Sequence, residues 1–589
     1  MPDFCAIVFT MTLYRRKFLT LLSALVLGIS NTHLHAENTA IYSGLDRIHP
    51  EVATHGMVVA QEKVAARVGL DILRKGGNAV DASVAVAFAL AVTLPRAGNL
   101  GGGGFMLVHD AKAGSTKAID YREMAPLAAF RDMYLDDAGD VVKNRSRFHG
   151  LAIGVPGTVA GMQKALDTSG TMTLTEVIAP AIKLARDGIV VTQSLSDGLK
   201  QAEERLKRWP QTAAVFYKPN GSFYEPGEIF KQPDLAATLD LIAQKGADGF
   251  YKGEVAQKIA DAVQAADGMI TTDDMANYKS VVRDPIGGTY RGYDILSMPP
   301  PSSGGTHIIE ILNTLEGYPI ADMGQNTAGT IHVMVEAMKQ AYADRATYLG
   351  DADFVDVPVK ELTNKQYASD IRGQIDMGKA RPASEVKASV LTPYESNETT
   401  HFSVVDRFGN TVSNTYTINF SFGSGIVATG TGVLMNNEMD DFSAKTGVSN
   451  AYGLIGGDAN AVAAGKRPLS SMSPTIVMKD GKVFLVTGSP GGSRIITTTL
   501  QIIMNVIDHK MNIAEATQAP RIHHQWLPDE LRVEEGISAD TKAILRAKGH
   551  DVVTKRTMGA VQSIMVDPET GVLLGATDLR RTSGSVEGY

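Results

Sequence analysis

A pair of adjacent threonines stands where the chain changes character. Thr399 and Thr400 follow Glu398, which closes an irregular polar stretch at about 365–398, and an alternating apolar pattern begins directly after them. A threonine hydroxyl is a weak nucleophile without a neighbouring base, and the residue's own α-amino group, with a pKa of about 7.7 to 8, can act as that base. The amine is free only if the chain is cut between Glu398 and Thr399. The stretch therefore fits either a self-cleaving chain with an N-terminal threonine nucleophile or the ordinary start of a β-strand.

A predicted hairpin brings a second threonine toward Thr399. The segments 401–406 and 411–418 flank the turn "RFGN", and their alternating pattern predicts two antiparallel strands. With a loop of about four residues, Val405 faces Val412 and Thr417 falls within about one residue of Thr399. We therefore expect two hydroxyl groups to meet at the open end of this hairpin.

A glycine pair offers backbone N–H groups to the same chemistry. A second hairpin, with the turn Asp480-Gly481, leads into "SPGGSR" and then into a helical pattern over 495–507. The first turn of a helix leaves N–H groups unbonded, so Gly491 and Gly492 could bind an oxyanion. A plain connection between a strand and a helix is an equally good interpretation of the glycines alone.

His401 suggests two other chemistries, and both lack residues that they need. A metal site at His401 has no second ligand at helical or hairpin spacing. A serine-histidine-aspartate triad that uses His401 and Asp406 has no nucleophile in a G-x-S-x-G turn. The sequence therefore favours neither of them.

The elements that must position these residues divide at Thr399. Before it, residues 61–77 predict an amphipathic helix, and Asn78 can cap a second, buried helix that ends at Pro95. "GNLGGGGF" at 98–105 predicts close backbone packing and not a nucleotide loop, because no Lys-Ser/Thr follows the glycines. The range of about 155–390 is mostly helical by pattern, whereas strands dominate after Thr399.

The composition indicates a soluble globular protein with a large apolar interior. A chain of 589 residues exceeds the size at which one core keeps growing, so we expect two or more domains or two closely wrapped halves. The chain is 44% hydrophobic and 20% charged. Its net charge of -8 and the lack of a long Lys/Arg run argue against a nucleic-acid partner.

The first 36 residues are typical of an export signal. Arg15, Arg16 and Lys17 precede an apolar run at 18–30 that is too short for a membrane anchor, and a cleavage point lies after Ala36. The arginine pair fits a twin-arginine address or an ordinary secretory signal. Cys5, the only cysteine, would leave with this segment, so we expect a periplasmic or secreted chain without disulfides.

Several longer motifs resemble those of bacterial γ-glutamyltranspeptidases. They are "GGNAVDA", "GNLGGGGFML", "DYREMAP", "MPPPSSGG", "TTHFSVVD", "NNEMDDFS", "GGDANAV", "KRPLSSMSPT" and "TGSPGGSRI". The resemblance covers essentially the whole chain after the signal. It implies an α+β fold, the four-layer αββα sandwich of the N-terminal nucleophile hydrolases, made as one precursor that cuts itself after Glu398. It also implies that a large subunit, 37–398, and a small subunit, 399–589, stay together as a heterodimer.

The resemblance also assigns the catalytic groups. It implies that Thr399 is the nucleophile both in self-cleavage and in turnover. Thr417 matches the threonine that supports the nucleophile's hydroxyl. Gly491 and Gly492 match the pair of residues that forms the oxyanion hole.

A zwitterionic γ-glutamyl head group needs a cation for its α-carboxylate and anions for its α-ammonium group. By resemblance, Arg122 pairs with the carboxylate, where a planar two-pronged donor suits it, and Ser470 and Ser471 add hydrogen bonds. The residues implied for the ammonium group are Asn419, Glu438 and Asp441. Some members of the family carry glutamine at the position of Glu438, so a carboxylate here changes the charge of the pocket. Tyr452 matches the aromatic residue of the flap that shields the pocket.

These assignments imply a ping-pong acyl transfer that requires no metal and no cofactor. Thr399 attacks the γ-amide of glutathione or a related γ-glutamyl compound, releases the amine and holds the γ-glutamyl group as an ester. Water then yields glutamate, or an amino acid or peptide accepts the group. Two alternatives stay open. One is a glutaryl-cephalosporin acylase of the same fold, against which Glu438 and Asp441 argue, and the other is a secreted binding protein that is never cut.

Overall fold

The computed structural model describes residues 46–386, 399–451 and 453–589. Contacts divide the chain into the unit Met1–Asp46 and the unit Arg47–Tyr589, and the described helices and strands belong to the second. The predicted export signal, Glu398 and Tyr452 lie outside the described residues. Within the described part of the chain, no helix is both long enough and apolar enough to cross a membrane.

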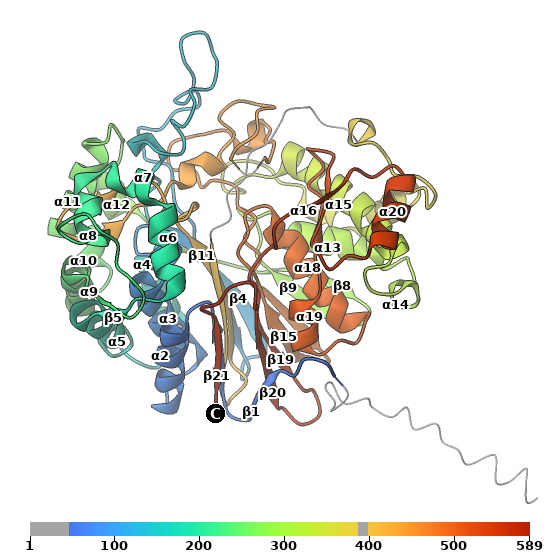
Figure 1. The fold of residues 1–589 in the computed structure, drawn as a ribbon, viewed down its shortest axis with the longest axis horizontal. Helices are drawn as coiled ribbons and strands as arrows, with labels where there is room; N and C mark the ends of the chain where they lie inside the picture. Colours follow the sequence, from blue (N-terminus) through green and yellow to red (C-terminus); the bar gives the residue numbers. More distant parts are fainter. Residues whose placement is uncertain (1–45, 387–398, 452) are drawn as a thin grey trace, which may run out of the picture. The chain divides into compact units, whose positions relative to one another are not determined.

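Two antiparallel sheets of seven strands each occupy the centre of the described unit (Figure 1). The first sheet has the order β21 (Ser585–Gly588), β2 (Met57–Ala60), β10 (Thr400–Val405), β11 (Thr411–Thr417), β3 (Gly103–Asp110), β4 (Ser115–Tyr121) and β7 (Val281–Arg283). The second has the order β1 (Glu51–Ala53), β20 (Leu573–Thr577), β19 (Gln562–Val566), β15 (Lys482–Thr487), β14 (Thr475–Lys479), β9 (Tyr293–Ser297) and β8 (Ile286–Tyr290). Strands from before and after Thr399 are thus neighbours in both sheets.

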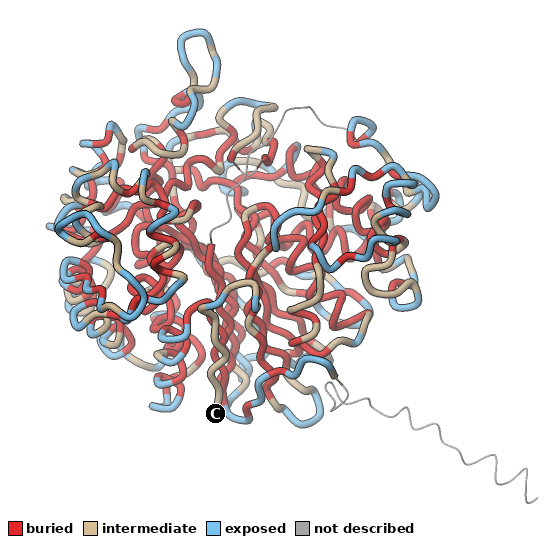
Figure 2. Tube along the Cα trace, in the orientation of Figure 1, coloured by how far each residue is buried: buried red, intermediate tan, exposed pale blue. Residues whose placement is uncertain are grey.

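Alternating side chains on the first sheet explain why the fold is layered. On β2, Val58 packs into the core between this sheet and the helices, whereas Val59 packs into the core between the two sheets. On β3, Met106 packs into the core next to the helices and Leu107 packs into the core between the two sheets. Neighbouring side chains of a strand point to opposite faces, so each strand supplies both cores. Figure 2 shows the central strands as buried along most of their length.

Helices lie on the outer side of each sheet and complete four layers (Figure 1). On the side of the first sheet are α2 (Lys63–Arg74), α3 (Ala79–Thr93), α4 (Thr158–Ser169), α5 (Leu174–Asp187), α6 (Gln193–Gln201), α7 (Glu203–Lys207), α8 (Pro210–Phe216), α9 (Pro233–Lys245), α10 (Asp248–Tyr251), α11 (Gly253–Gln264) and α12 (Thr272–Asn277). On the side of the second are α13 (Gly304–Leu315), α14 (Ile320–Met323), α15 (Ala328–Tyr348), α16 (Val359–Leu362), α17 (Lys365–Arg372), α18 (Arg494–Ile507), α19 (Ile513–Gln518) and α20 (Ala539–Ala547). Contacts of α3 with β10 and of α13 with β8 join each helical layer to its sheet. The predicted αββα sandwich is confirmed.

Seven short strands of the described residues lie outside the two sheets and pair among themselves. They are β5 (Ile189–Val190) with β6 (Ile229–Phe230), β12 (Val427–Ala428) with β13 (Val433–Leu434), and β16 (Ile522–His523) with β17 (Leu531–Val533) and β18 (Val552–Thr554). The pairing of β17 with β18 is parallel.

The helices predicted before the glycine-rich segment are confirmed. α2 ends before Gly76, whose φ of +97° suits a residue without a side chain. Asn78 and Asp81 form a reciprocal capping box at the start of α3. All residues of α3 are buried, as its uninterrupted apolar sequence predicts.

The glycine-rich segment packs backbone against the strand that carries Thr417, as predicted. A Cβ atom at Gly102 would overlap the carbonyl oxygen of Thr417, and one at Gly104 would overlap the backbone of Tyr416. Any side chain at these positions would push β11 aside. The glycines therefore fix the position of Thr417 within the first sheet.

Candidate active site

The hairpin of β10 and β11 differs from the predicted pairing by one residue. Val405 faces Thr411 and not Val412. The cause is the turn, because the N–H of Asp406 donates to the carbonyl oxygen of Asn410 and the Asp406 carboxylate accepts from the N–H of Asn410. This pair closes a loop of residues 407–409, which is one residue shorter than the predicted loop.

Extended by one pair, the observed register sets Thr417 opposite Thr399. Their Oγ1 atoms lie 3.3 Å apart, and both side chains are buried. The backbone N–H of Asn419 donates to Thr417 Oγ1 over 2.8 Å. Thr399 Oγ1 donates to Thr417 Oγ1, and because a hydroxyl oxygen has two lone pairs, Thr417 can accept from Thr399 and from Asn419 at once. The structure thus brings together the two hydroxyl groups that the sequence predicted to meet.

The predicted glycine pair directly precedes α18. Gly491 has a φ of +137° and Gly492 a φ of +57°, which residues with side chains rarely adopt. Their carbonyl oxygens accept from the N–H groups of Arg494 and Ile495. Within the described residues, neither glycine N–H has a hydrogen-bond acceptor of its own. The pair therefore has unbonded donors at a helix start, as an oxyanion site requires.

A small pocket opens at Thr399 and gathers most of the predicted site residues. Those that line it are Thr399, Thr417, Gly492, Arg122, Asn419, Glu438, Asp441, Ser470 and Ser471. Gly491 adjoins the pocket through Gly492, and Tyr452 lies outside the described residues.

Several further residues line the pocket that the sequence did not predict: Arg345, Leu454, Met472, Ser493 and Ile495. The last four lie within or beside the motifs that carry the family resemblance, so the motifs themselves could have suggested them. Arg345 is in the last turn of α15, outside those motifs, and had no such signal.

Arg122 is fully buried and lies among carboxylates. Its Nη1 donates to Glu438 Oε1 and its Nη2 to Asp441 Oδ2, both at a distance of 2.5 Å. Glu123 Oε2 lies 3.5 Å from Arg122 Nη1. Glu438 and Asp441 are the first and last residues of one 3-10 turn, which directs both carboxylates toward the guanidinium. The predicted cation and two of the predicted anions of the pocket therefore form one cluster.

This cluster contains three carboxyl groups, which is more negative charge than the one guanidinium of Arg122 can balance. Burial raises the pKa values of Glu438 and Asp441, and Arg122 offsets only part of that rise. Burial likewise raises the pKa of Glu123 to about 7, against the lowering effect of Arg122. Burial alone would lower the pKa of Arg122, but Glu438 and Asp441 raise it above its ordinary value, so the guanidinium is charged. We therefore expect the cluster to hold at least one proton near neutral pH.

The two pocket serines differ in what they contact. Ser470 Oγ accepts from the N–H of Met472 over 3.0 Å, which fixes its side chain against its own loop. Ser471 Oγ accepts from Arg345 Nη2 over 3.2 Å. Both hydroxyl protons are left to be directed toward a ligand.

His401 is a buried histidine between the sheets. Its Nδ1 bonds to Thr415 Oγ1 over 2.8 Å and its Nε2 to Ser403 Oγ over 3.2 Å. Burial lowers its pKa to about 3, so the ring is neutral. Both ring nitrogens of His401 are hydrogen-bonded to hydroxyl groups. This arrangement supports neither the metal site nor the serine-histidine-aspartate triad that the sequence had suggested.

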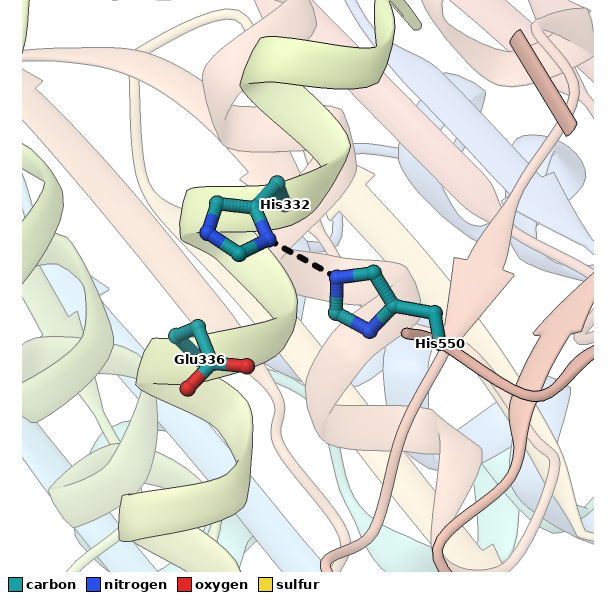
Figure 3. A group of neighbouring side chains, drawn as sticks. All are labelled: His332, Glu336 and His550. Carbon is teal, nitrogen blue, oxygen red and sulfur yellow. Dashed lines mark hydrogen bonds between the residues drawn. The ribbon is translucent and has the colours of Figure 1, made fainter. Parts of the chain in front are cut away.

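Among the described residues, one group has metal-ligating side chains close together: His332, Glu336 and His550 (Figure 3). His332 Nδ1 and His550 Nε2 share a hydrogen bond of 2.8 Å. Glu336 Oε1 accepts from Lys339 Nζ over 3.0 Å, and Arg381 Nε lies 3.8 Å from Glu336 Oε2. A divalent ion would add charge beside these two cations. We therefore interpret the group as a polar contact between α15 and the segment before β18, and we assign no metal to it.

Two facing antiparallel sheets between helical layers, with a threonine at the mouth of a central strand, define the N-terminal nucleophile hydrolase class of fold. A solved structure, the cephalosporin acylase of Bacillus halodurans, matches with a TM-score of 0.79 at 29% identity, over 93% of this chain and 98% of that chain. The structure of Helicobacter pylori gamma-glutamyltranspeptidase matches with a TM-score of 0.55 at 45% identity, over 58% of this chain and 97% of that chain.

The family follows from the sequence comparisons. The family model of gamma-glutamyltranspeptidase matches residues 65–588. The glutathione hydrolase proenzyme of Escherichia coli (strain K12) is 57% identical over 545 residues, which are 92% of this chain and 93% of that protein. The chain therefore belongs to the gamma-glutamyltranspeptidase family.

Proposed function

We propose that this chain is a self-processing γ-glutamyl hydrolase and transferase that acts on glutathione and related γ-glutamyl compounds. The observation that carries the proposal is one pocket in which the hydroxyl of Thr399 lies with a supporting hydroxyl, a buried guanidinium and buried carboxylates. The name of the 57% identical relative, a glutathione hydrolase proenzyme, agrees with both the substrate and the self-processing.

The chemistry is acyl transfer through an ester on Thr399. Thr399 Oγ1 attacks the carbonyl carbon of the γ-amide while the free α-amino group of the same residue takes the hydroxyl proton. The N–H groups of Gly491 and Gly492 stabilise the tetrahedral oxyanion. Collapse of this intermediate returns the proton to the departing amine and leaves the γ-glutamyl ester. Water or the amine of an amino acid or peptide then attacks the ester and frees Thr399.

The charge of the pocket favours a substrate with an α-ammonium group. The cephalosporin acylase of the same fold suggests a second candidate activity. A glutaryl acyl group, the alternative considered for it, carries no such cation. Glu438 and Asp441 share Arg122 with the nearby Glu123, so one guanidinium faces three carboxyl groups. An ammonium group would balance this excess, whereas a glutaryl group would add a further anion without any cation. The γ-glutamyl compound is therefore the better fit.

Self-processing gives the active nucleophile its amine. Before the cut, Thr399 has no free α-amino group, so its first reaction is attack on the Glu398 carbonyl, which forms an ester that water opens. If the export signal ends at Ala36, the large subunit has 398 - 36 = 362 residues and the small subunit has 589 - 398 = 191. The two form a heterodimer in the periplasm or outside the cell.

The test combines the N-terminus of the small subunit with two chromogenic amides. We expect the small band of purified protein to begin at Thr399 and γ-glutamyl p-nitroanilide to be turned over faster than glutaryl p-nitroanilide. Thr399→Ala should stay uncut and inactive, whereas Thr399→Ser, which keeps a hydroxyl, should be cut and turn over slowly. A small band that begins at Thr400, or faster turnover of the glutaryl amide, would contradict the proposal. A full-length band without turnover would instead favour a binding protein.

A further inference from the structure

The residue that follows the predicted oxyanion pair is held by side chains from two directions. Ser493 lines the pocket beside Gly492 and directly precedes α18. Its carbonyl oxygen accepts from the phenol of Tyr342 in α15, and its Oγ donates to Gln525 Oε1 over 2.7 Å. All three residues are buried. Tyr342 precedes Thr399 in the chain and Gln525 follows it, so both sides of the predicted cut contribute to this contact.

Gln525 is itself fixed by hydrogen bonds that return to α18. Its Nε2 donates to the carbonyl oxygen of Leu527 over 3.3 Å, which leaves Oε1 as the acceptor for Ser493. Burial lowers the pKa of His523 to about 3, so this ring is neutral and has one proton. The proton is on Nε2, because this atom lies 3.0 Å from Gln525 Oε1, which can only accept. His523 Nδ1 then accepts from the hydroxyl of Thr497 in α18 over 2.8 Å.

Tyr342 is fixed by its ring as well as by its hydroxyl group. Its ring is perpendicular to that of His523, with the ring centres 5.8 Å apart, and lies nearly parallel to that of His307 at 6.4 Å. Burial raises the pKa of Tyr342, so the phenol keeps its proton near neutral pH and acts as the donor. The carbonyl oxygen of Ser493 is therefore bound by a rigid donor.

The oxyanion pair has little rigidity of its own. Gly491 and Gly492 have no side chains to pack, and their φ angles are +137° and +57°. Their carbonyl oxygens accept from the N–H groups of Arg494 and Ile495, so the direction of both peptides depends on where α18 begins. A catalytic group that is displaced by about 1 Å can lose roughly 10²-fold in rate. The position of Ser493, between the pair and the helix, is therefore important for catalysis.

We propose that Tyr342 and Gln525 are positioning residues that hold Ser493, and through it the two glycine N–H groups, in line with the oxyanion. This inference rests on the proposed acyl transfer at Thr399 and deepens it. Neither side chain lines the pocket, so each acts through Ser493. Because Tyr342 precedes the predicted cut, the large subunit completes the oxyanion site of the small subunit.

The first test is the effect of Tyr342→Phe, which keeps the ring and removes the hydroxyl, on kcat and KM. An oxyanion forms both when Thr399 is acylated and when its ester is opened, so both steps slow and KM stays almost constant. For γ-glutamyl p-nitroanilide, we expect kcat per cut chain to fall about 10- to 100-fold and KM to change less than about threefold. The glutaryl amide should lose the same factor, because the oxyanion does not involve the head group. An unchanged kcat, or a changed ratio of the two amides, would overturn the inference.

Tyr217→Phe is the matched control for the loss of a buried phenol. Tyr217 is buried at the end of α8 and donates to the carbonyl oxygen of Leu199 over 2.9 Å, and it does not line the pocket. This variant should keep its kcat while its stability to urea falls about as much as that of Tyr342→Phe. Equal losses of kcat in the two variants would mean that Tyr342 only supports the fold and would overturn the inference.

Failure of the proposed function is a separate outcome. A protein that cleaved the glutaryl amide and not the γ-glutamyl amide would contradict the proposed function. The loss of kcat in Tyr342→Phe on the glutaryl amide would still test the inference, because both amides form the same oxyanion at Thr399.

Gln525 provides a second test, which remains available if Tyr342→Phe is not cut. Gln525→Leu removes the oxygen that accepts from Ser493, whereas Gln525→Glu keeps an oxygen at this place. We expect kcat to fall about tenfold in Gln525→Leu and to recover for the most part in Gln525→Glu, since one buried hydrogen bond is lost and then restored. Equal kcat values for these two variants would overturn the inference.

A double variant shows whether Tyr342 acts through the glycines. Gly492→Ala already displaces the N–H groups of the pair, so Tyr342→Phe should add little further loss of kcat in that background. Losses that multiply in the double variant would show that Tyr342 acts elsewhere and would overturn the inference.

Discussion

The hydroxyl oxygens of Thr399 and Thr417 lie 3.3 Å apart at the open end of the β10–β11 hairpin. Thr399 donates to Thr417 Oγ1, and the backbone N–H of Asn419 donates to the same oxygen and so fixes the acceptor that holds the Thr399 hydroxyl. Because the glycine-rich segment fixes β11 from its other side, this distance depends on backbone packing and not on a flexible side chain.

Thr417→Ala should reduce turnover far more than it reduces folding. The variant loses the acceptor that holds the reacting hydroxyl of Thr399, and loss of one hydrogen bond at the reacting group lowers kcat by roughly 10²- to 10³-fold. We expect the precursor still to be cut, with KM for γ-glutamyl p-nitroanilide nearly unchanged. Thr417→Ser, which keeps the hydroxyl, is the control and should retain most of the activity. Equal kcat values for Thr417→Ala and the unaltered protein would rule out the supporting role.

Asp441→Asn should change substrate preference and not only rate. The substitution removes one of the negative charges assigned to the α-ammonium group, so kcat/KM for the γ-glutamyl amide should fall about 10- to 100-fold while that for the glutaryl amide falls less. The ratio of the two is the measurement. Asp440→Asn is the matched control, because Asp440 lies in the same turn but contacts Ser146 and Arg147, and its ratio should not change. An unchanged ratio in Asp441→Asn would place the ammonium group elsewhere.

Much of the site could be predicted because its residues sit in contiguous motifs. The hairpin signal predicted the meeting of Thr399 with Thr417 even though the pairing of Val405 was wrong by one residue. The error arose because Asp406 closes the turn with its own backbone and carboxylate, which a count of loop residues does not capture.

Other parts of the fold had no local signal. β8, with two glycines in five residues, has weak strand propensity and is held at the edge of the second sheet by pairing with β9. Arg345 could not be assigned from sequence, because an arginine in the last turn of a helix is usually a solvent-facing cation near the helix C-terminus. Its burial depends on contacts with Ser303 and Ser471, which are distant in sequence.

Gly492→Ala should test the predicted oxyanion pair. A Cβ at φ +57° is strained, by roughly 1–2 kcal/mol, and would shift the unbonded N–H groups at the pocket. We expect kcat to fall at least about tenfold with a smaller change in KM, because the oxyanion exists only in the transition state and intermediate. Gly481→Ala is the control for backbone strain alone. Gly481 has a φ of +75° and lies in a distant hairpin turn, and a Cβ atom added there would have no atom within 4 Å. The control variant should lose stability but keep its kcat, and similar kcat losses in both variants would argue against the oxyanion role.

Glu123→Gln should alter how stability depends on pH. Burial raises the pKa of Glu123 from 4.5 to about 7, against the lowering effects of Arg122 and of the backbone N–H groups of Glu123 and Gly103. Between pH 4.5 and 7 the folded chain binds more protons at this site than the unfolded chain, so this group's contribution to stability is full below pH 4.5 and is lost as the pH rises through 7. Because glutamine stays neutral, the free energy of unfolding of Glu123→Gln, measured by urea denaturation at pH 5 and pH 8, should fall less over this interval than that of the unaltered protein.

Glu254→Gln, on the exposed face of α11, is the control and should show the same pH dependence of stability as the unaltered protein. The same pH dependence in Glu123→Gln would show that Glu123 is already ionised within the cluster around Arg122.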